Sequence, residues 1–178
     1  LWSVGEYLFP LAMVAFALIA YLAFRRIGAF LGRVLSDGGV FDVTANNSFA
    51  QLLPAFALSM TAVGMAAPAA MSTVPATVGV SLVLSITLGA IAGLYALAAA
   101  IIALGSMLQH GTAKESAPTL MIVVPILTIL GIMTMRQEHG LHTTFDAHGG
   151  MADNLILTTT ILAIQGVFLA LGLLLVGL

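Results

Sequence analysis

Hydrophobic residues fill most of the chain in long stretches, each close to or longer than the roughly 20 residues that a helix needs to cross a bilayer. The stretches are apolar on all sides and do not alternate with a period of two, so we expect no β-barrel. A helix satisfies its own backbone hydrogen bonds, as hydrocarbon requires. We therefore predict an all-α membrane protein with about five transmembrane helices. The expected spans are residues 7–24, 49–67, 76–108, 117–135 and 154–178.

Two span boundaries do not follow from apolarity alone. The stretch 43–113 has no Asp, Glu, Lys or Arg and is far too long for one span, so it must fold back. Pro68 and Pro75, with small polar residues between them, mark the expected turn. Between Arg25 and Ser36, apolar residues recur at helical spacing among arginines. This pattern predicts an interfacial helix in a cytoplasmic loop at 25–47, and the alternative is a cytoplasmic extension of the first span.

Composition supports the membrane assignment. The 178 residues are 61% hydrophobic and 7% charged, whereas a soluble domain carries about 25% charged residues. We expect one transmembrane domain over residues 1–178, with the lipid bilayer as its surroundings. The absence of cysteine excludes disulfides and thiolate metal sites. A net charge of −2 gives no basic surface for nucleic acid.

The placement of Lys and Arg predicts the orientation. Four of the five follow the first and third spans, which end on the same side: Arg25, Arg26, Arg33 and Lys114. Arg136 lies in the predicted outer loop, residues 136–153, among more numerous acidic residues. Positive residues favour the cytoplasmic side. We expect a multi-pass protein of the cell (inner) membrane, with its first residue outside and its last residue inside.

Prolines distinguish the second and fourth spans, which contain Pro54 and Pro125. A proline inside a helix removes one hydrogen bond and kinks it, and broken helices often line transport pathways. We expect these two spans to bend there and to stand side by side, with the third span outside them. Thr61 and Thr128 follow the prolines at helical spacing and complete the set of pore-lining candidates. The alternative is that each threonine bonds back to its own helix.

The outer loop contains His139, His142 and His148 together with Glu138 and Asp146. Imidazole and carboxylate groups can bind zinc. A glycine interrupts the pattern, and no metalloprotease motif is present, so we expect a solvated loop without a metal. No catalytic motif appears elsewhere. We therefore expect no enzyme activity and no cofactor.

Two segments resemble the tellurite-resistance/C4-dicarboxylate transporter (TehA-like) family, which includes the slow-type anion channels of plants. They are residues 48–60, SFAQLLPAFALSM, and residues 110–125, HGTAKESAPTLMIVVP. The resemblance implies a barrel of ten helices in hairpins around a pore, of which these spans would be the second to sixth. It also implies a homotrimer with one pore in each subunit.

Three functions are compatible with these observations. The first is a transporter or channel for small anions. The second is a non-catalytic membrane subunit of a larger complex, such as a respiratory assembly with partner membrane subunits. The third is a membrane enzyme that uses a metal in the histidine loop. We favour the first, with the second as the main alternative.

Overall fold

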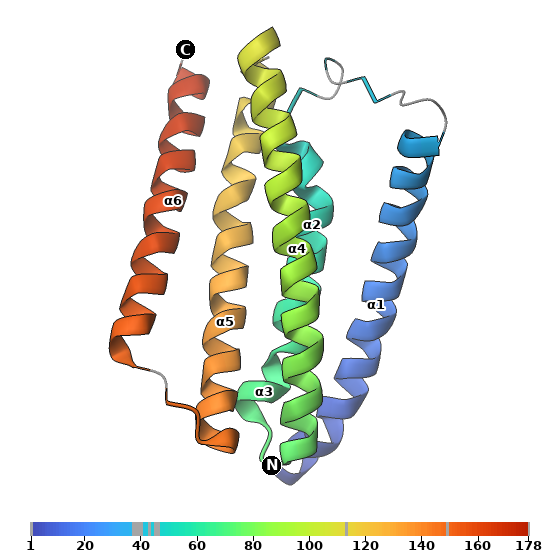
Figure 1. Cartoon of the computed structure of the whole chain (residues 1–178), viewed down its shortest axis with the longest axis vertical. Coiled ribbons are helices and arrows are strands. Elements are labelled where there is room, and N and C mark those ends of the chain that lie inside the picture. The colour runs from blue at the N-terminus through green and yellow to red at the C-terminus, as the bar shows by residue number, and fades with distance from the viewer. Residues whose placement is uncertain are drawn as a thin grey trace.

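The computed structural model describes residues 2–36, 41, 42, 44, 47–112, 114–148 and 150–177, and these residues form helices joined by short connections (Figure 1). The 3₁₀-helices are labelled η. The order is α1 (Trp2–Ser36), η1 (Phe49–Leu52), α2 (Leu53–Met65), α3 (Ala67–Met71), α4 (Pro75–His110), η2 (Lys114–Ile122), α5 (Val123–Phe145) and α6 (Met151–Gly177).

Among the described residues, five segments are long and apolar enough to cross a membrane. They are Val4–Ser36, Phe49–Met71, Pro75–His110, Lys114–Phe145 and Ala152–Gly177. The prediction of an all-α, multi-pass membrane protein is therefore confirmed. Successive segments run in opposite directions, so the two chain ends lie at opposite ends of the bundle (Figure 1).

The first span is longer than the sequence indicated. Residues 25–36 continue α1 as one uninterrupted helix, because no proline follows the arginines and both glycines of this stretch lie in open space. The backbone thus matches a helical extension of the first span, not a separate helix. Part of the predicted loop, at 37–40, 43, 45 and 46, lies outside the described residues. Contact of this segment with headgroups stays a prediction.

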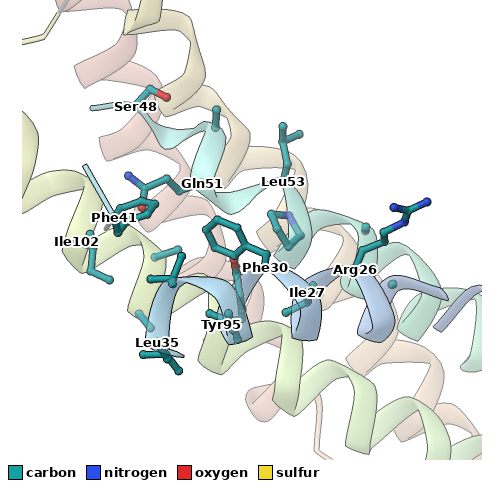
Figure 2. A pocket seen from close by; sticks show the side chains of 18 residues that line it. Arg26, Ile27, Phe30, Leu35, Phe41, Ser48, Gln51, Leu53, Tyr95 and Ile102 are labelled. Carbon is teal, nitrogen blue, oxygen red and sulfur yellow. The ribbon is translucent and has the colours of Figure 1, made fainter. Parts of the chain in front are cut away.

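Helix α1 is fastened to the bundle through its N-terminal half. The Glu6 carboxylate accepts hydrogen bonds from the Ser72 hydroxyl (2.7 Å) and the Thr73 backbone N–H (2.6 Å), in the turn between α3 and α4. Farther along α1, the Phe16 ring packs on Gly64 of α2. Farther along, α1 diverges from α2 and α4 and leaves an open space, the α1 groove (Figure 2).

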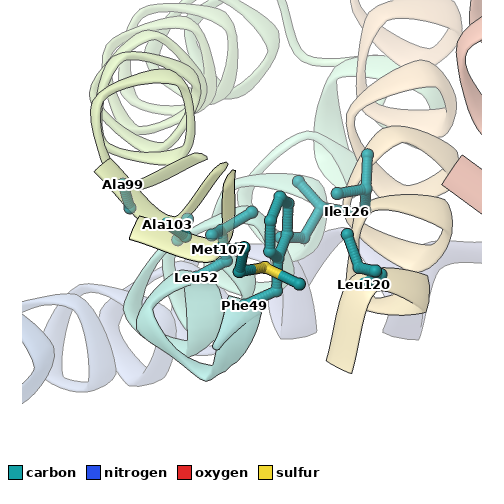
Figure 3. Packing of buried hydrophobic residues seen from close by; sticks show 9 residues of the cluster. Phe49, Leu52, Ala99, Ala103, Met107, Leu120 and Ile126 are labelled. Carbon is teal, nitrogen blue, oxygen red and sulfur yellow. The ribbon is translucent and has the colours of Figure 1, made fainter. Parts of the chain in front are cut away.

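Helix α2 is the centre of the bundle and packs against α1, α4 and α5. Its first turns and η1 lie in the larger apolar cluster (Figure 3). There the fully buried Phe49 meets Ala99 and Ala103 of α4 and Ile126 of α5. The alanines let α4 approach closely, which matters because lipid provides no hydrophobic force between helices.

The two prolines lie at the starts of α-helices, although both are inside membrane-spanning segments. The predicted bends at these positions stay a prediction. Pro54 is in the first turn of α2 and Pro125 is the third residue of α5, and each follows a 3₁₀-helix. Proline is tolerated in a first turn because its missing N–H would have no partner there. The two 3₁₀-helices are joined, since the Phe49 N–H donates to the Thr119 hydroxyl (3.0 Å).

The predicted arrangement of the spans agrees with the packing. Span two lies against span four, because α2 contacts α5 and η1 contacts η2. Span three, α4, is not enclosed by the described helices. It leaves an apolar face exposed at Val83, Leu94, Leu97 and Ile101.

The predicted outer loop at 136–153 is mostly helical, because α5 continues to Phe145 and α6 begins at Met151. Gly140 does not interrupt the helix as its sequence context suggested. It is buried where α5 crosses α3, and an added Cβ would lie 2.4 Å from the Ala69 carbonyl oxygen. Asp146 ends the helix in the left-handed conformation (φ 52°). The glycine is therefore a contact point between helices.

We expect Gly140→Ala to lower the free energy of unfolding by about 1–3 kcal/mol, because backbone would have to shift to admit the methyl group. Gly93→Ala is the matched control. An added Cβ at Gly93 meets nothing within 4 Å, and alanine favours a helix by about 1 kcal/mol. Thermal melting of both variants in detergent measures the difference. Equal melting temperatures would contradict the close contact.

The orientation can be tested with single cysteines, since the chain has none of its own. Arg33 and Lys114 lie toward one end of the bundle and His142 toward the other, and all three are exposed. An impermeant maleimide should label cysteine at position 142 from outside. It should label positions 33 and 114 only after permeabilisation, because positive residues stay inside. Labelling of position 142 from the cytoplasm alone would reverse the orientation.

Candidate functional site: polar groups at the break in the central helix

The central span is interrupted between α2 and α3. Helix α2 ends at Met65 and α3 begins at Ala67, with Pro68 at its start. Proline has no N–H to donate to the carbonyl four residues earlier, which belongs to Gly64. A break of this kind inside a membrane needs polar partners from neighbouring helices.

Ser81 of α4 supplies one partner. Its hydroxyl accepts a hydrogen bond from the Ala69 N–H (2.9 Å) and donates one to the Met65 carbonyl (2.5 Å). In an unbroken helix these two backbone groups would bond to each other. The serine, which is 0% exposed, is inserted into the backbone ladder, a recognised cause of a kink.

Helix α5 supplies the others. Arg136 Nη1 donates a hydrogen bond to the Val63 carbonyl oxygen (2.7 Å), just before the break. The next residue, Gln137, donates from Nε2 to Ser85 Oγ (2.9 Å), and Gln137 is only 8% exposed. We call Ser81, Ser85, Arg136 and Gln137 the break cluster. It joins α4 and α5 to the broken central helix.

The positive charge of Arg136 has no carboxylate partner among the residues that the structure describes. Arginine stays protonated and carries five N–H donors. The Val63 carbonyl accepts from Nη1 alone. The N–H groups on the other two guanidinium nitrogens can therefore donate to another acceptor. A half-buried guanidinium with free donors attracts an anion and repels a cation.

A second polar contact lies at the start of α5. Gln165 of α6 donates from Nε2 to the Val124 carbonyl (3.0 Å) and to the Thr128 hydroxyl (2.8 Å). The Thr128 hydroxyl itself donates to the Val124 carbonyl (2.9 Å). This contact ties α6, which is otherwise mostly exposed, to the bundle.

The four pore-lining candidates lie in different surroundings. Pro54 lines the α1 groove, and Pro125 is half-buried in the first turn of α5. Thr61 is 2% exposed and its hydroxyl donates to the Ala57 carbonyl (2.9 Å). Both threonines thus bond back to their own helices, as the alternative reading proposed. A pore-lining role for the four stays a prediction.

The three histidines of the predicted outer loop are exposed. His139 and His142 lie on α5, and His148 follows its end. Within the described part of the chain, no group of three or more His, Cys, Asp and Glu residues could hold a metal ion.

Sequence reasoning missed every member of the break cluster. Ser81 and Ser85 look like ordinary small residues in an apolar run. Arg136 was placed in the outer loop because of its charge, although it lies within α5. One signal in the sequence indicates these contacts: Gln137 stands beside Arg136 at the end of a span. Polar side chains in such positions often form hydrogen bonds with neighbouring helices in membranes.

Comparison with protein-family models, curated proteins and solved structures found no match. The functional argument therefore rests on the residues themselves.

We expect Ser81→Ala to lower the free energy of unfolding by about 1–3 kcal/mol, because it leaves two buried backbone groups without their partner. Thr87→Ala on the same helix is the control. Thr87 is exposed and only bonds back to the Val83 carbonyl, so its loss should cost no more than about 0.5 kcal/mol. Melting in detergent compares the two. If both variants melted alike, Ser81 would not hold the break together.

Proposed function

We propose that the protein is a transporter or channel for small anions in the cell (inner) membrane, related to the TehA-like family that two of its segments resemble. It is not an enzyme and needs no cofactor. The observation that carries the proposal is the unpaired Arg136 beside the break in the central helix.

The chemistry of this position suits an anion. An anion that leaves water needs hydrogen-bond donors in place of its hydration shell, and guanidinium, amide and hydroxyl groups provide them. Arg136 has donors beyond the one that bonds Val63. One fixed positive charge attracts anions without holding them as tightly as several would, which lets them leave again.

The helices that carry the break cluster do not by themselves enclose a complete pathway. Helices α1 and α6 leave most of their side chains exposed. We propose that further copies of the chain cover part of this surface in a homo-oligomer, a trimer by the family resemblance. Assembly of this kind is common, since closed symmetric homo-oligomers predominate among oligomeric proteins.

The exposed faces also support the second candidate, a non-catalytic subunit of a larger membrane complex. Leu155, Ile156 and Leu162 of α6 are each at least 60% exposed, and such a smooth apolar helix can pack against a partner subunit. Purification in mild detergent separates the two. A transporter should elute as a homo-oligomer, and a subunit should elute with other proteins.

Anion flux into proteoliposomes tests the proposal. We expect Arg136→Gln to reduce chloride or nitrate flux at least tenfold, because one charge-assisted hydrogen bond contributes about 1.5–3 kcal/mol and tenfold corresponds to about 1.4 kcal/mol. Glutamine removes the charge and keeps an amide N–H, and melting in detergent checks that the variant stays folded. Arg136→Lys should retain more flux than Arg136→Gln, because it keeps the charge.

Arg25→Gln is the control, since Arg25 is exposed on α1 far from the break cluster. Its flux should equal that of the unaltered protein. Unchanged flux in the folded Arg136→Gln variant would show that the guanidinium takes no part in transport. Absence of anion flux in the unaltered, folded protein would contradict the transport function. The second candidate, a non-catalytic subunit of a larger complex, would then be favoured.

A further inference from the structure

The C-terminal turns of α5 are polar, although they belong to a segment that is long and apolar enough to cross the membrane, Lys114–Phe145. Glu138, His139 and His142 lie in these turns and make no hydrogen bond or ion pair with another residue that the structure describes. Both histidines are exposed. Ionisable side chains in membrane helices almost always face other helices or a water-filled cavity.

Contacts with α4 fix the height of these turns in the bundle. Gln137 donates a hydrogen bond to Ser85 (2.9 Å). The Phe145 ring lies 3.8 Å from the position that a Cβ would take at Gly79. The C-terminal turns of α5 therefore stand at the height of the first turns of α4, at the same end of the bundle (Figure 1).

Helix α1 covers the same height. Its Glu6 accepts hydrogen bonds from the turn that precedes α4, and its Phe16 packs on Gly64 of α2. Gly64 directly follows the residue whose carbonyl Arg136 holds. The first half of α1 therefore extends from the outer end of the bundle to the height of the break cluster.

Large apolar side chains are exposed on α1 and α4 at this height. Five of them are more than half exposed: Leu8, Leu11, Val14, Val80 and Val83. An exposed apolar surface of this kind marks contact with a membrane or a partner, and these residues lie in membrane-spanning segments. Lipid therefore covers α1 and α4 at the height where α5 is polar.

The start of α6 shows that water reaches the bundle at this height. A Cβ added at Gly131 of α5 would lie 2.8 Å from Ile161 of α6, and the two helices run in opposite directions (Figure 1). Asp153 precedes Ile161 by as many residues as His139 follows Gly131, so the two stand at about the same height. Asp153 is exposed, and its carboxylate needs water.

One face of α5 leads from this water to the break cluster. Arg136, His139 and Thr143 follow one another at helical spacing and share a face, which we call the α5 polar face. His139 and Thr143 are exposed, and Arg136 is half-buried at the inner end. Glu138 lies nearly opposite Arg136 on the helix, so its carboxylate does not share this face.

We propose that the α5 polar face lines a water-filled outer vestibule, which extends from the external surface to Arg136. Its water hydrates side chains that have no partner among the described residues and that lipid cannot accommodate. An anion reaches the guanidinium through it without crossing hydrocarbon. As an entrance for anions the vestibule rests on the proposed transport function, whereas its water content can be tested without any transport.

Cysteine labelling in right-side-out membrane vesicles tests the vestibule. His139→Cys and Thr143→Cys should react with an impermeant maleimide at least about tenfold faster than Leu11→Cys and Val83→Cys, because the reactive thiolate forms in water and not in lipid. The two control positions lie at the same height and are also exposed. The rates are compared again after permeabilisation, so that the orientation of the chain does not decide the result.

Fast labelling at the control positions as well would place this whole end of the bundle in water and overturn the proposal. Slow labelling at all four positions would overturn it too, because lipid or a partner would then cover the α5 polar face. Fast labelling at positions 139 and 143 in a folded chain that carries no anion flux would support the vestibule and contradict the transport function alone.

The connection to Arg136 is tested by charge at the entrance. A sulfonate-bearing thiol reagent attached at position 143 should reduce anion flux about fivefold or more, because its negative charge repels anions. An ammonium-bearing reagent of similar size at the same position should reduce the flux less. Unchanged flux after complete reaction with the sulfonate reagent would overturn the role of the vestibule as the anion entrance.

Discussion

Inside hydrocarbon, a backbone carbonyl that loses its N–H partner has no water to replace it, and each such group costs several kcal/mol. The break between α2 and α3 creates this problem in the central span, toward the end of the bundle where α4 begins (Figure 1). Ser81 resolves it by standing between the Ala69 N–H and the Met65 carbonyl, and Arg136 resolves it at the Val63 carbonyl. The positions of α4 and α5 around α2 are fixed by these contacts.

Close packing supplies the rest of the stability, since lipid does not drive helices together. Several glycines let a neighbour approach closely, and three of them show how the contacts differ. Gly64 receives the ring of Phe16, Gly89 receives the end of Met133, and Gly140 touches the backbone at Ala69. Gly89 and Gly93 of α4 differ from each other. An added Cβ at Gly89 would meet Met133, whereas one at Gly93 would meet nothing within 4 Å. The first two contacts involve side chains that can adjust, whereas the third is fixed by backbone.

The spans could be predicted because a membrane helix is defined by length and apolarity, which composition records directly. Local sequence did not distinguish a proline in the middle of a helix from one in its first turn. The residues just before each proline, such as Leu52 and Ile122, are as apolar as those after it, yet they belong to 3₁₀-helices. The break cluster was hidden for a different reason. Its bonds join residues from 12 to 73 positions apart, and nothing near Arg136 in the sequence points to Val63.

Helix α2 takes part in both the break cluster and the α1 groove. Its first turns, at Pro54 and Ala57, form one wall of the groove, and its last turn carries the carbonyl that Arg136 holds. The same helix is the most buried of the five spans. The attachment of α1 and the geometry around Arg136 therefore both depend on the position of α2. Helices α1 and α6 have few buried residues, so lipid or other subunits can cover them without displacing α2.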